Sequence, residues 1–473
     1  MNARCAVYAS SALLMLLAAC RVGPNYHAPG LPAGAEAPLA AAGAPEQSAD
    51  SPPDAWWRLY DDARLDTLVQ EALRANRTLA AADANFAAAR AVLSSAQAAR
   101  YPSTVASAEG RYGRDALTDE ILELGGHPPQ TFWLFADIFQ AAYEVDLFGR
   151  VHRAIEVANA NADAVGAARD SVRVVVAAET ARAYAAICAL GAQLEVARRS
   201  YDVVAHEAEI TQRRHEAGAN SVFDVTRAQA LASQVRAAIP LLEGQRRVAL
   251  LALTAELGRT PAQAPTELAA CVAPPRLLAV LPVGDGAALV RRRPDVRQAE
   301  RRLAAATAQI GVATADLYPS IRLVGLYGGA ATALSDLNNN VGRTWGVGPS
   351  ISWTFPDMAA PRARVRQAKA QQSAALASFD SVVLTALKEI EQALSVYGAA
   401  LANRQSLADA RDKIHAAFGI AHDQFTAGSV STLDVLTTEQ TLVALDAAVA
   451  SADSALIEDQ IAVFKSLGGG WEN

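Results

Sequence analysis

The chain is poor in the residues from which most catalytic and metal sites are built. It has 4 cysteines and 7 histidines among 473 residues, and neither type recurs at a spacing that holds a metal ion. No grouping of serine, histidine and aspartate stands out, and neither does a phosphate loop or a paired-carboxylate context. These absences argue against an enzyme and predict a protein that needs no cofactor and no metal.

Aromatic and basic residues are also scarce. Aromatics make up 6% of the chain although 52% is hydrophobic, and alanine dominates that apolar fraction. Because alanine buries little surface, this composition favours closely packed long helices over a thick globular core. The 42 Lys and Arg against 49 Asp and Glu give a net charge of −7, which argues against a nucleic-acid partner. The one dense basic run, at 291–293, is interpreted as a solvated helix start.

Cysteine pairing is not expected. Apart from Cys5 and Cys20 near the start, the chain has only Cys188 and Cys271. Two cysteines of an exported protein could pair, but these lie in different contexts, a helical stretch and a proline-rich linker. We therefore expect two ordinary, unpaired residues.

Residues 1–19 have the pattern of an export signal. Arg4 supplies the positive start, an apolar run covers 12–18, and small residues precede Cys20. The run is too short to cross a bilayer and is typical of a secretory signal peptide. Leu-Ala-Ala-Cys resembles a bacterial lipobox, which implies cleavage before Cys20 and its lipidation; Arg21 in place of aspartate then points to the outer membrane. An ordinary signal with an incidental cysteine is the alternative.

The chain contains an internal duplication. Tyr-Pro-Ser at 101–103 recurs at 318–320, a shift of 217 positions. The segment 217–225 recurs as 427–435 at a shift of 210, and in both copies five residues separate a glycine from an Asp-Val pair. Two landmarks in the same order and at similar spacing indicate a tandem repeat of about 200 residues.

Both copies show the same order of elements: a helix, two extended segments, a very long helix, a glycine turn and another long helix. No proline occurs from 151 to 217 or from 362 to 427, and helices of that length would reach about 100 Å. Apolar residues recur along them at three-four spacing, typical of a coiled-coil seam. The predicted organisation is a signal peptide at 1–19, a tether and belt segment at 20–64, repeat 1 at 65–256, a linker at 257–290, repeat 2 at 291–467 and a tail at 468–473. Repeat 1 has predicted strands near 101–114 and 131–148 and a hairpin tip near 218. Repeat 2 has predicted strands near 319–330 and 343–356 and a hairpin tip near 428.

Two of the extended segments alternate between apolar and small or polar residues, strictly in 344–356 and with Asp137 as an exception in 133–147; their partners around 104–112 and 321–327 alternate less cleanly. In the stretch 344–356, Trp345, Val347, Ile351 and Trp353 share one parity, while threonine, serine and glycine occupy the other. Such alternation predicts strands with one oily face, joined as hairpins by polar connections at 115–130 and 331–343. Strands of a soluble sandwich are the alternative. Four strands cannot close a sheet alone, so we expect partner strands from other chains.

Together these features resemble the TolC-like outer-membrane factor family, in its OprM/NodT lipoprotein branch. The resemblance covers nearly the whole mature chain. It is carried by Cys20 with Gly23-Pro24-Asn25-Tyr26, Trp56-Trp57, the Asp-Leu-Phe-Gly-Arg run at 146–150, Arg293-Pro294-Asp295-Val296, Tyr318-Pro319 and the two glycine turns.

The resemblance implies a mixed α/β membrane protein that is a homotrimer. Each chain would give four strands to one 12-stranded barrel in the outer membrane, and its helices would continue as a periplasmic tunnel. The linker and both chain ends would form a belt around the tunnel. A periplasmic adaptor would dock on the tunnel tip, an inner-membrane pump would supply energy, and lipidated Cys20 would hold outer-membrane lipid.

The resemblance also assigns roles at the tips. The adaptor-docking residues would be Gly218, Ala219, Asn220, Gly428, Ser429 and Val430, and the periplasmic gate would be Asp434 with Asp224 and Phe425. Duplicated helix capping by the two aspartates is the alternative to the gate. Two positions depart from the family pattern: Phe425 stands where a tyrosine links neighbouring helices, and Phe355-Pro356 changes a strand-to-helix corner.

The predicted function is the passive exit duct of a tripartite efflux system for drugs or other small toxic compounds. A duct for type I protein secretion or metal efflux would use a similar tube. A coiled-coil lipoprotein that spaces the envelope without a pore would share the anchor and rods, but it would not need oily alternating strands in both copies.

Overall fold

The structure is a computed structural model that describes residues 21–469, apart from 36, 38, 40–46, 49, 115, 127, 278–279, 285–289, 338 and 341. The signal segment, Cys20 and the last residues of the tail lie outside the described residues. The chain divides into two compact units. Unit 1 holds the described parts of Met1–Pro29, Ala87–Ala164 and Ala299–Ser378, and unit 2 those of Gly30–Phe86, Val165–Gln298 and Phe379–Asn473.

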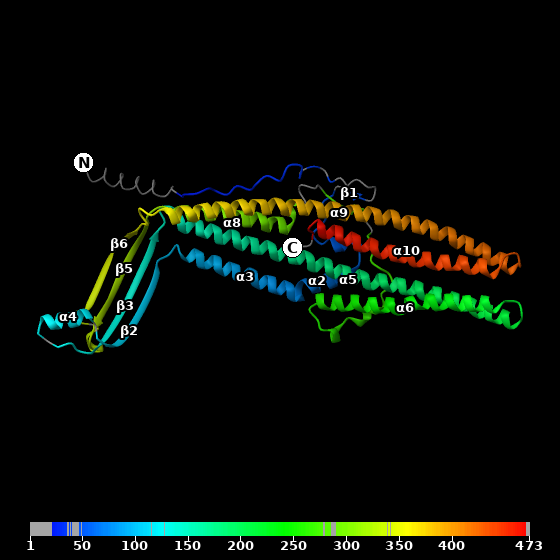
Figure 1. Cartoon of the computed structure of the whole chain (residues 1–473), viewed down its shortest axis with the longest axis horizontal. Coiled ribbons are helices and arrows are strands. Elements are labelled where there is room, and N and C mark those ends of the chain that lie inside the picture. Colours follow the sequence, from blue (N-terminus) through cyan, green and yellow to red (C-terminus); the bar gives the residue numbers. More distant parts are fainter. Residues whose placement is uncertain are drawn as a thin grey trace. The chain divides into compact units, whose positions relative to one another are not determined.

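Long helices and two strand pairs account for most of the chain (Figure 1). In chain order the elements are β1 (Gln47–Ser48), η1 (Trp56–Tyr60), α2 (Ala63–Ala75), α3 (Arg77–Ala98), β2 (Ser103–Gly113), α4 (Ala116–Leu124), β3 (Phe132–Val145), α5 (Arg150–Glu216), α6 (Val222–Glu256), η2 (Pro261–Gln263), η3 (Thr266–Ala270), β4 (Leu281–Pro282), α8 (Pro294–Ala315), β5 (Ser320–Ala331), η4 (Leu334–Asp336), β6 (Arg343–Ser352), α9 (Ala359–Thr426) and α10 (Thr432–Ser466).

Two segments differ from the sequence-based expectation. The single helix expected at the start of repeat 1 is two helices, because the Asn76 side chain accepts hydrogen bonds from the N–H groups of Thr78 and Leu79 and so starts α3. The first polar connection also contains a helix, α4, whose first turn carries Asp119. Local capping therefore adds helix boundaries that apolar periodicity does not show.

Unit 1 is built around an antiparallel sheet with the strand order β2-β3-β5-β6. Side chains of directly paired residues lie on the same face of a sheet. Tyr143 faces Leu323, which in turn faces Pro349, and Phe139 faces Tyr327, which faces Trp345. The alternating aromatic residues of separate strands therefore form one continuous oily face.

This oily face is uncovered in the described chain. Trp345 is 75% exposed, Val347 70% and Ile351 67%. The opposite face carries polar and charged residues, among them Glu144 and its cross-strand partner Arg322. Among the described residues β2 pairs only with β3 and β6 only with β5, so each outer strand leaves one row of backbone groups unpaired.

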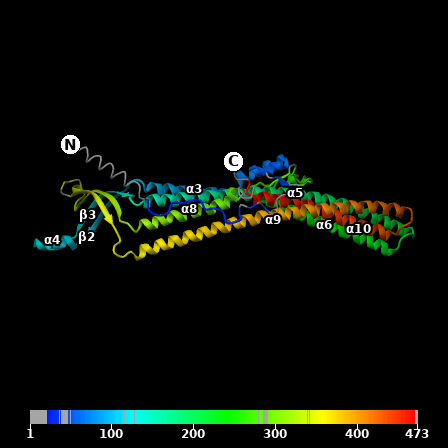
Figure 2. The same cartoon turned by 90° about the horizontal axis from the view of Figure 1, so that it is seen from above.

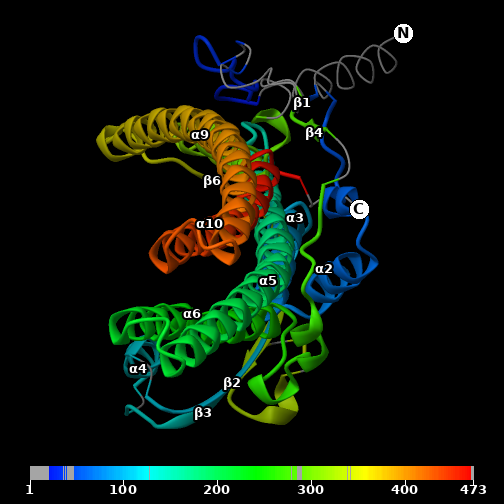
Figure 3. The ribbon, with the colours of Figure 1, turned by 90° about the vertical axis from the view of Figure 1, so that its right-hand side faces the viewer.

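The core of unit 2 joins the belt segments to the long helices. Trp56, which is fully buried, stacks on Phe464 of α10 with ring centroids 4.9 Å apart. The indole N–H of Trp57 donates to Asp66 of α2 at 2.8 Å. Hairpins α5–α6 and α9–α10 lie side by side in this unit (Figure 3). The Trp-Trp motif thus ties the N-terminal segment to the C-terminal helix.

Arg293 is buried, so the interpretation of the basic run as a solvated helix start is wrong at this position. Its side chain is 9% exposed and pairs with Asp295 at 2.8 Å and with Glu389 of α9 at 2.7 Å. It also donates to the backbone oxygen of Ser466 at 2.8 Å. A buried guanidinium needs such partners, and here they connect the start of α8 to α9 and α10.

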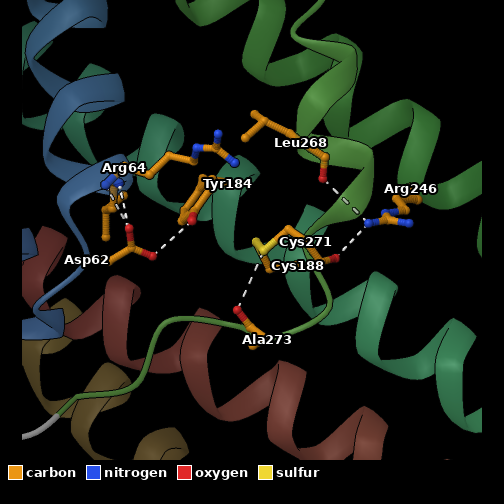
Figure 4. The surroundings of a disulfide bond; sticks show 9 residues. Asp62, Arg64, Tyr184, Cys188, Arg246, Leu268, Cys271 and Ala273 are labelled. Atoms are coloured by element: carbon orange, nitrogen blue, oxygen red, sulfur yellow. Dashed lines mark hydrogen bonds between the residues drawn. A yellow bond between two sulfur atoms is a disulfide. The ribbon is translucent and has the colours of Figure 1, made fainter.

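Cys188 of α5 and Cys271, the residue after η3, form a disulfide (Figure 4). The expectation of two unpaired cysteines is therefore wrong. The linker is drawn onto α5 by Arg246, which donates to the backbone oxygens of Leu268 at 3.5 Å and Cys271 at 2.6 Å. Gly191 makes room, because a Cβ there would overlap the Cys271 oxygen. Neither contact is visible in the local sequence around each cysteine.

Replacing both Cys188 and Cys271 by serine should lower the free energy of unfolding. The bond closes a loop with a sequence separation of 83 residues. The chain-entropy model then gives a loss of roughly 4 kcal/mol. The measurement is the thermal midpoint of the purified protein with and without reductant. The native protein should lose stability on reduction, and the double serine variant should not respond; equal midpoints for both proteins without reductant would contradict this.

Candidate functional site

The two glycine turns of unit 2 are exposed ends of helical hairpins. Gly218 has φ +77° and Gly428 has φ +75°, a left-handed conformation that favours glycine. The next residues close the turns, since Ala219 donates to the Arg214 oxygen at 2.8 Å and Ser429 to the Gln424 oxygen at 2.9 Å. A Cβ at either glycine would meet nothing within 4 Å. Both turns therefore have open space around them within the chain.

Asp224 and Asp434 each take part in a capping box. The Asp224 carboxylate accepts from the Ser221 backbone N–H at 3.0 Å, and the Ser221 hydroxyl accepts from the Asp224 N–H at 3.2 Å. In the second hairpin, the Asp434 carboxylate likewise accepts from the Ser431 backbone N–H at 3.0 Å, and the Ser431 hydroxyl accepts from the Asp434 N–H at 3.3 Å. Hydrogen bonds from Ser431 hold the pKa of the Asp434 carboxyl below its ordinary value. Capping thus accounts for both aspartates at once.

The two tips contact one another within the chain. Both hairpins turn at the same end of unit 2 (Figures 1 and 2). The Asn220 amide donates to the Thr432 hydroxyl at 3.5 Å. The Arg214 guanidinium lies 4.4 Å from the centre of the Phe425 ring. Phe425 has no hydroxyl, and its aromatic face instead binds a cation of the other hairpin.

An apolar seam lies behind the tips, between the two hairpins. It joins Val204 and Ala208 of α5 to Leu231 of α6 and Leu436 of α10, each buried to at least nine-tenths. Glu439, one helical turn after Leu436, is buried at the same seam with 1% of its surface exposed. Close packing of small and branched residues therefore holds the hairpins together next to the tips.

In unit 1, the Asp-Leu-Phe-Gly-Arg motif builds the corner between β3 and α5. The Asp146 carboxylate accepts from the N–H groups of Val151 at 3.0 Å and His152 at 2.9 Å, which caps α5. Arg150 donates two hydrogen bonds to Glu144 at 2.7 and 2.5 Å. The motif thus fixes the direction in which the long helix leaves the strand.

The corner between β6 and α9 is built differently. The Phe355–Pro356 peptide bond is cis. Asp357 accepts from the Ala359 N–H at 3.1 Å at the start of α9. The start of α9 is thus fixed by Asp357.

The segment after Cys20 packs against the corner between β3 and α5 in unit 1. Val22 donates to the Phe148 oxygen at 3.2 Å. The side chain of Arg153, 3% exposed, donates to Asn25 at 2.8 Å and to two backbone oxygens of the segment. Gly23 has φ +86°, and a Cβ there would lie 2.5 Å from the Gly311 Cα. These contacts explain why the segment needs Gly23 and Asn25.

Tyr26 completes the seat. Its hydroxyl donates to Glu300 of α8 at 2.9 Å, and the Arg301 guanidinium lies 5.8 Å from its ring centre. Residue 21, the neighbour of the candidate lipidated cysteine, lies against Gly149 at the β3–α5 corner, with the Arg21 Cα 3.2 Å from a Cβ built there. Residue 21 thus lies beside the corner at the end of β3.

Sequence patterns do not reveal three features near the tips: the Arg214–Phe425 contact, the Asn220–Thr432 hydrogen bond and the burial of Glu439. The first two join residues of different repeats, and no local pattern encodes such a pair. Glu439 does leave a trace, since it shares a helix face with Leu436 and Val443. Among the described residues, no three His, Cys, Asp or Glu side chains are grouped to hold a metal ion.

A family model described as outer membrane efflux protein matches the chain twice, over residues 68–259 and 287–469. Each match spans one copy of the repeated order of helices and strands. The two segments together cover most of the chain.

Relatives match over nearly their full length. Nodulation protein T of Rhizobium leguminosarum bv. viciae is 28% identical, covering 98% of this chain and 93% of that protein. The antibiotic efflux pump outer membrane protein ArpC of Pseudomonas putida is 29% identical, and the match covers 96% of this chain and 94% of that protein. The solved structure of the outer-membrane channel OprN is similar with a TM-score of 0.87 at 33% identity, covering 96% of this chain and 100% of that chain.

Proposed function

The chain belongs to the outer membrane efflux protein family, and we propose that three copies of it form the exit duct of an RND-type efflux machine. The observation that carries the trimer is the sheet of unit 1, with an uncovered oily face and unpaired edges on β2 and β6. In lipid every backbone polar group must be paired, so the sheet has to close with strands of other copies. Three copies supply twelve strands, an even number within the range of outer-membrane barrels.

The sheet, and not a helix, is the proposed membrane-crossing part. Helices α5 and α10 each contain a stretch long and apolar enough to span a bilayer. In α5, however, 72% of that stretch is buried inside the protein. The apolar character of α5 therefore serves helix packing. Only 6% of the corresponding stretch of α10 is buried within one chain, and we assign it to contacts between copies, with both helices in a periplasmic tunnel.

The exposed tips favour docking of a periplasmic adaptor that connects the duct to an inner-membrane pump. The chain itself would be passive, because energy would come from the pump. ArpC is an antibiotic efflux pump outer membrane protein. We infer cargo of the same class, small toxic compounds, for this duct.

The docking role predicts that side chains added at the tips weaken adaptor binding without unfolding the protein. Gly428→Gln or Gly218→Gln places a side chain in open space, and its cost is backbone strain of about 1 kcal/mol. Cross-linking of a purified adaptor to the trimer should fall. Gly244→Gln is the control, since Gly244 on α6 also has no neighbour within 4 Å of an added Cβ. Full cross-linking in both tip variants would place docking elsewhere.

The gate role concerns Asp434. Three copies around an axis would bring three exposed carboxylates near one another, which would attract cations and narrow the opening. Asp434→Ala should raise ion conductance in planar bilayers and weaken cation preference. Ser431→Ala is the matched control, because it removes the capping hydroxyl but keeps the carboxylate. If both variants conduct like the native protein, Asp434 is a cap and not a gate.

Lipidation of Cys20 is supported by the seat of the following residues beside the end of the sheet. A lipid chain on Cys20 would start where the sheet enters the membrane. Cys20→Ser should abolish labelling by radioactive palmitate. Cys5→Ser should leave labelling intact, because Cys5 lies in the segment removed on cleavage. Labelled Cys20→Ser protein would rule this anchor out.

A further inference from the structure

Glu439 is a buried carboxyl group without a hydrogen-bond partner. It is 1% exposed, and neither of its carboxylate oxygens has a partner among the described residues. It lies on α10 five residues after Asp434, which is about 8 Å further along the helix. An unpaired buried carboxylate is costly, so its presence in the seam needs an explanation.

Charged groups surround Glu439 from every neighbouring helix. A cleft of about 290 Å³ beside it is lined by Arg199 of α5, Arg411 and His415 of α9 and Asp446 of α10. The like charge of Glu207 on α5 acts on Glu439. On α6, Arg236 lies over the Tyr201 ring at 5.9 Å, at the edge of the seam. The cleft therefore offers two guanidinium groups that Glu439 does not contact in this packed arrangement.

The packed arrangement suits the neutral acid. Burial, and secondly the charge of Glu207, raise the pKa of Glu439 from its ordinary value of 4.5 to about 7. The ionised form would have to leave the apolar seam or pull water into it. Arg411 is one partner that the cleft offers to the ionised form: its Nε lies 3.3 Å from Asp412 and 4.0 Å from Asp446 and makes no hydrogen bond within the described chain.

We propose that Glu439 is a proton-binding residue that controls how tightly the two hairpins close behind the tip. When protonated it stays in the seam with Val204, Ala208 and Leu436. When ionised it turns into the cleft toward Arg411 and Arg199, and the hairpins separate more easily. The inference rests on the proposed function in one respect, that the hairpin end is the part of the duct that opens.

The sign of the pH effect follows from the raised pKa. Below the ordinary value of 4.5 the carboxyl is neutral in the packed and the open seam, so it carries no penalty. As pH rises from there through about 7, only the open seam ionises freely, and the packed seam loses stability. Above that pH the penalty is constant. The hairpins should thus be more tightly closed in acid than at neutral or alkaline pH.

Opening of the seam can be measured as the alkylation rate of a buried thiol. Ala208→Cys places one thiol in the seam, while Cys188 and Cys271 are blocked by their disulfide. The full-length protein in detergent is treated with a maleimide from about pH 5 to about pH 9. Each rate is divided by that of the same probe with Glu439→Gln, which cancels ionisation of the thiol itself. Because the pKa of Glu439 is 4.5 in the open seam and about 7 in the packed seam, the ratio should rise on the order of a hundredfold across this range.

Two further variants make the test specific. Asp459→Asn is the matched control, because Asp459 lies on α10 and burial raises its pKa too, but it is outside the seam cluster. It should leave the pH profile unchanged. Glu207→Gln should move the midpoint to lower pH, since it removes the like charge next to Glu439. This variant also keeps the test decisive if Glu439→Gln does not fold.

A ratio that stays flat with pH would overturn the inference, and so would an unchanged midpoint in Glu207→Gln. Neither result would bear on the duct itself, which bilayer conductance tests separately. Conversely, a pH-dependent ratio in a protein that forms no channel would support the proton-binding seam and refute only the proposed function.

Discussion

Backbone pairing at the edges of a four-stranded sheet is the constraint on which the rest of the molecule depends. One face of the sheet carries exposed Trp345, Val347 and Ile351, and both outer strands leave N–H and C=O groups unpaired within the described chain. Water could satisfy those groups, but it would leave the aromatic face exposed to solvent at a large cost. Lipid would cover the face but could not pair the edges. If the sheet closes with strands of other copies in lipid, its hydrophobic face is covered and the backbone groups at its edges are paired.

The strand-to-helix corners fix the directions in which the long helices leave the sheet. Asp146 and the Arg150–Glu144 pair aim α5 away from β3, and Asp357 starts α9 after β6. In unit 2 the hairpins are joined by small residues and by few polar contacts. Such a seam is close-packed, and the buried acid Glu439 makes its closure sensitive to protonation. The seam between the two hairpins can therefore be closely packed and still open.

Much of this could be predicted from the sequence because the signals are local and periodic. Alternation of Trp345, Val347 and Ile351 specified the oily face, and Gly218 and Gly428 specified the turns between long helices. The features that sequence patterns missed depend on contacts between distant segments. Cys188 meets Cys271 because Arg246 and Gly191 guide the linker, and Arg293 is buried because Glu389 and Ser466 come from α9 and α10. The Phe425–Arg214 contact likewise joins two repeats.

The central claim is that the sheet is completed by other copies of this chain. Native mass spectrometry of the full-length protein released from detergent micelles measures this directly. The account predicts a complex of three copies that resists dissociation and that aggregates when detergent is withdrawn. A monodisperse single chain that remains in solution without detergent, after removal of any lipid chain, would contradict it.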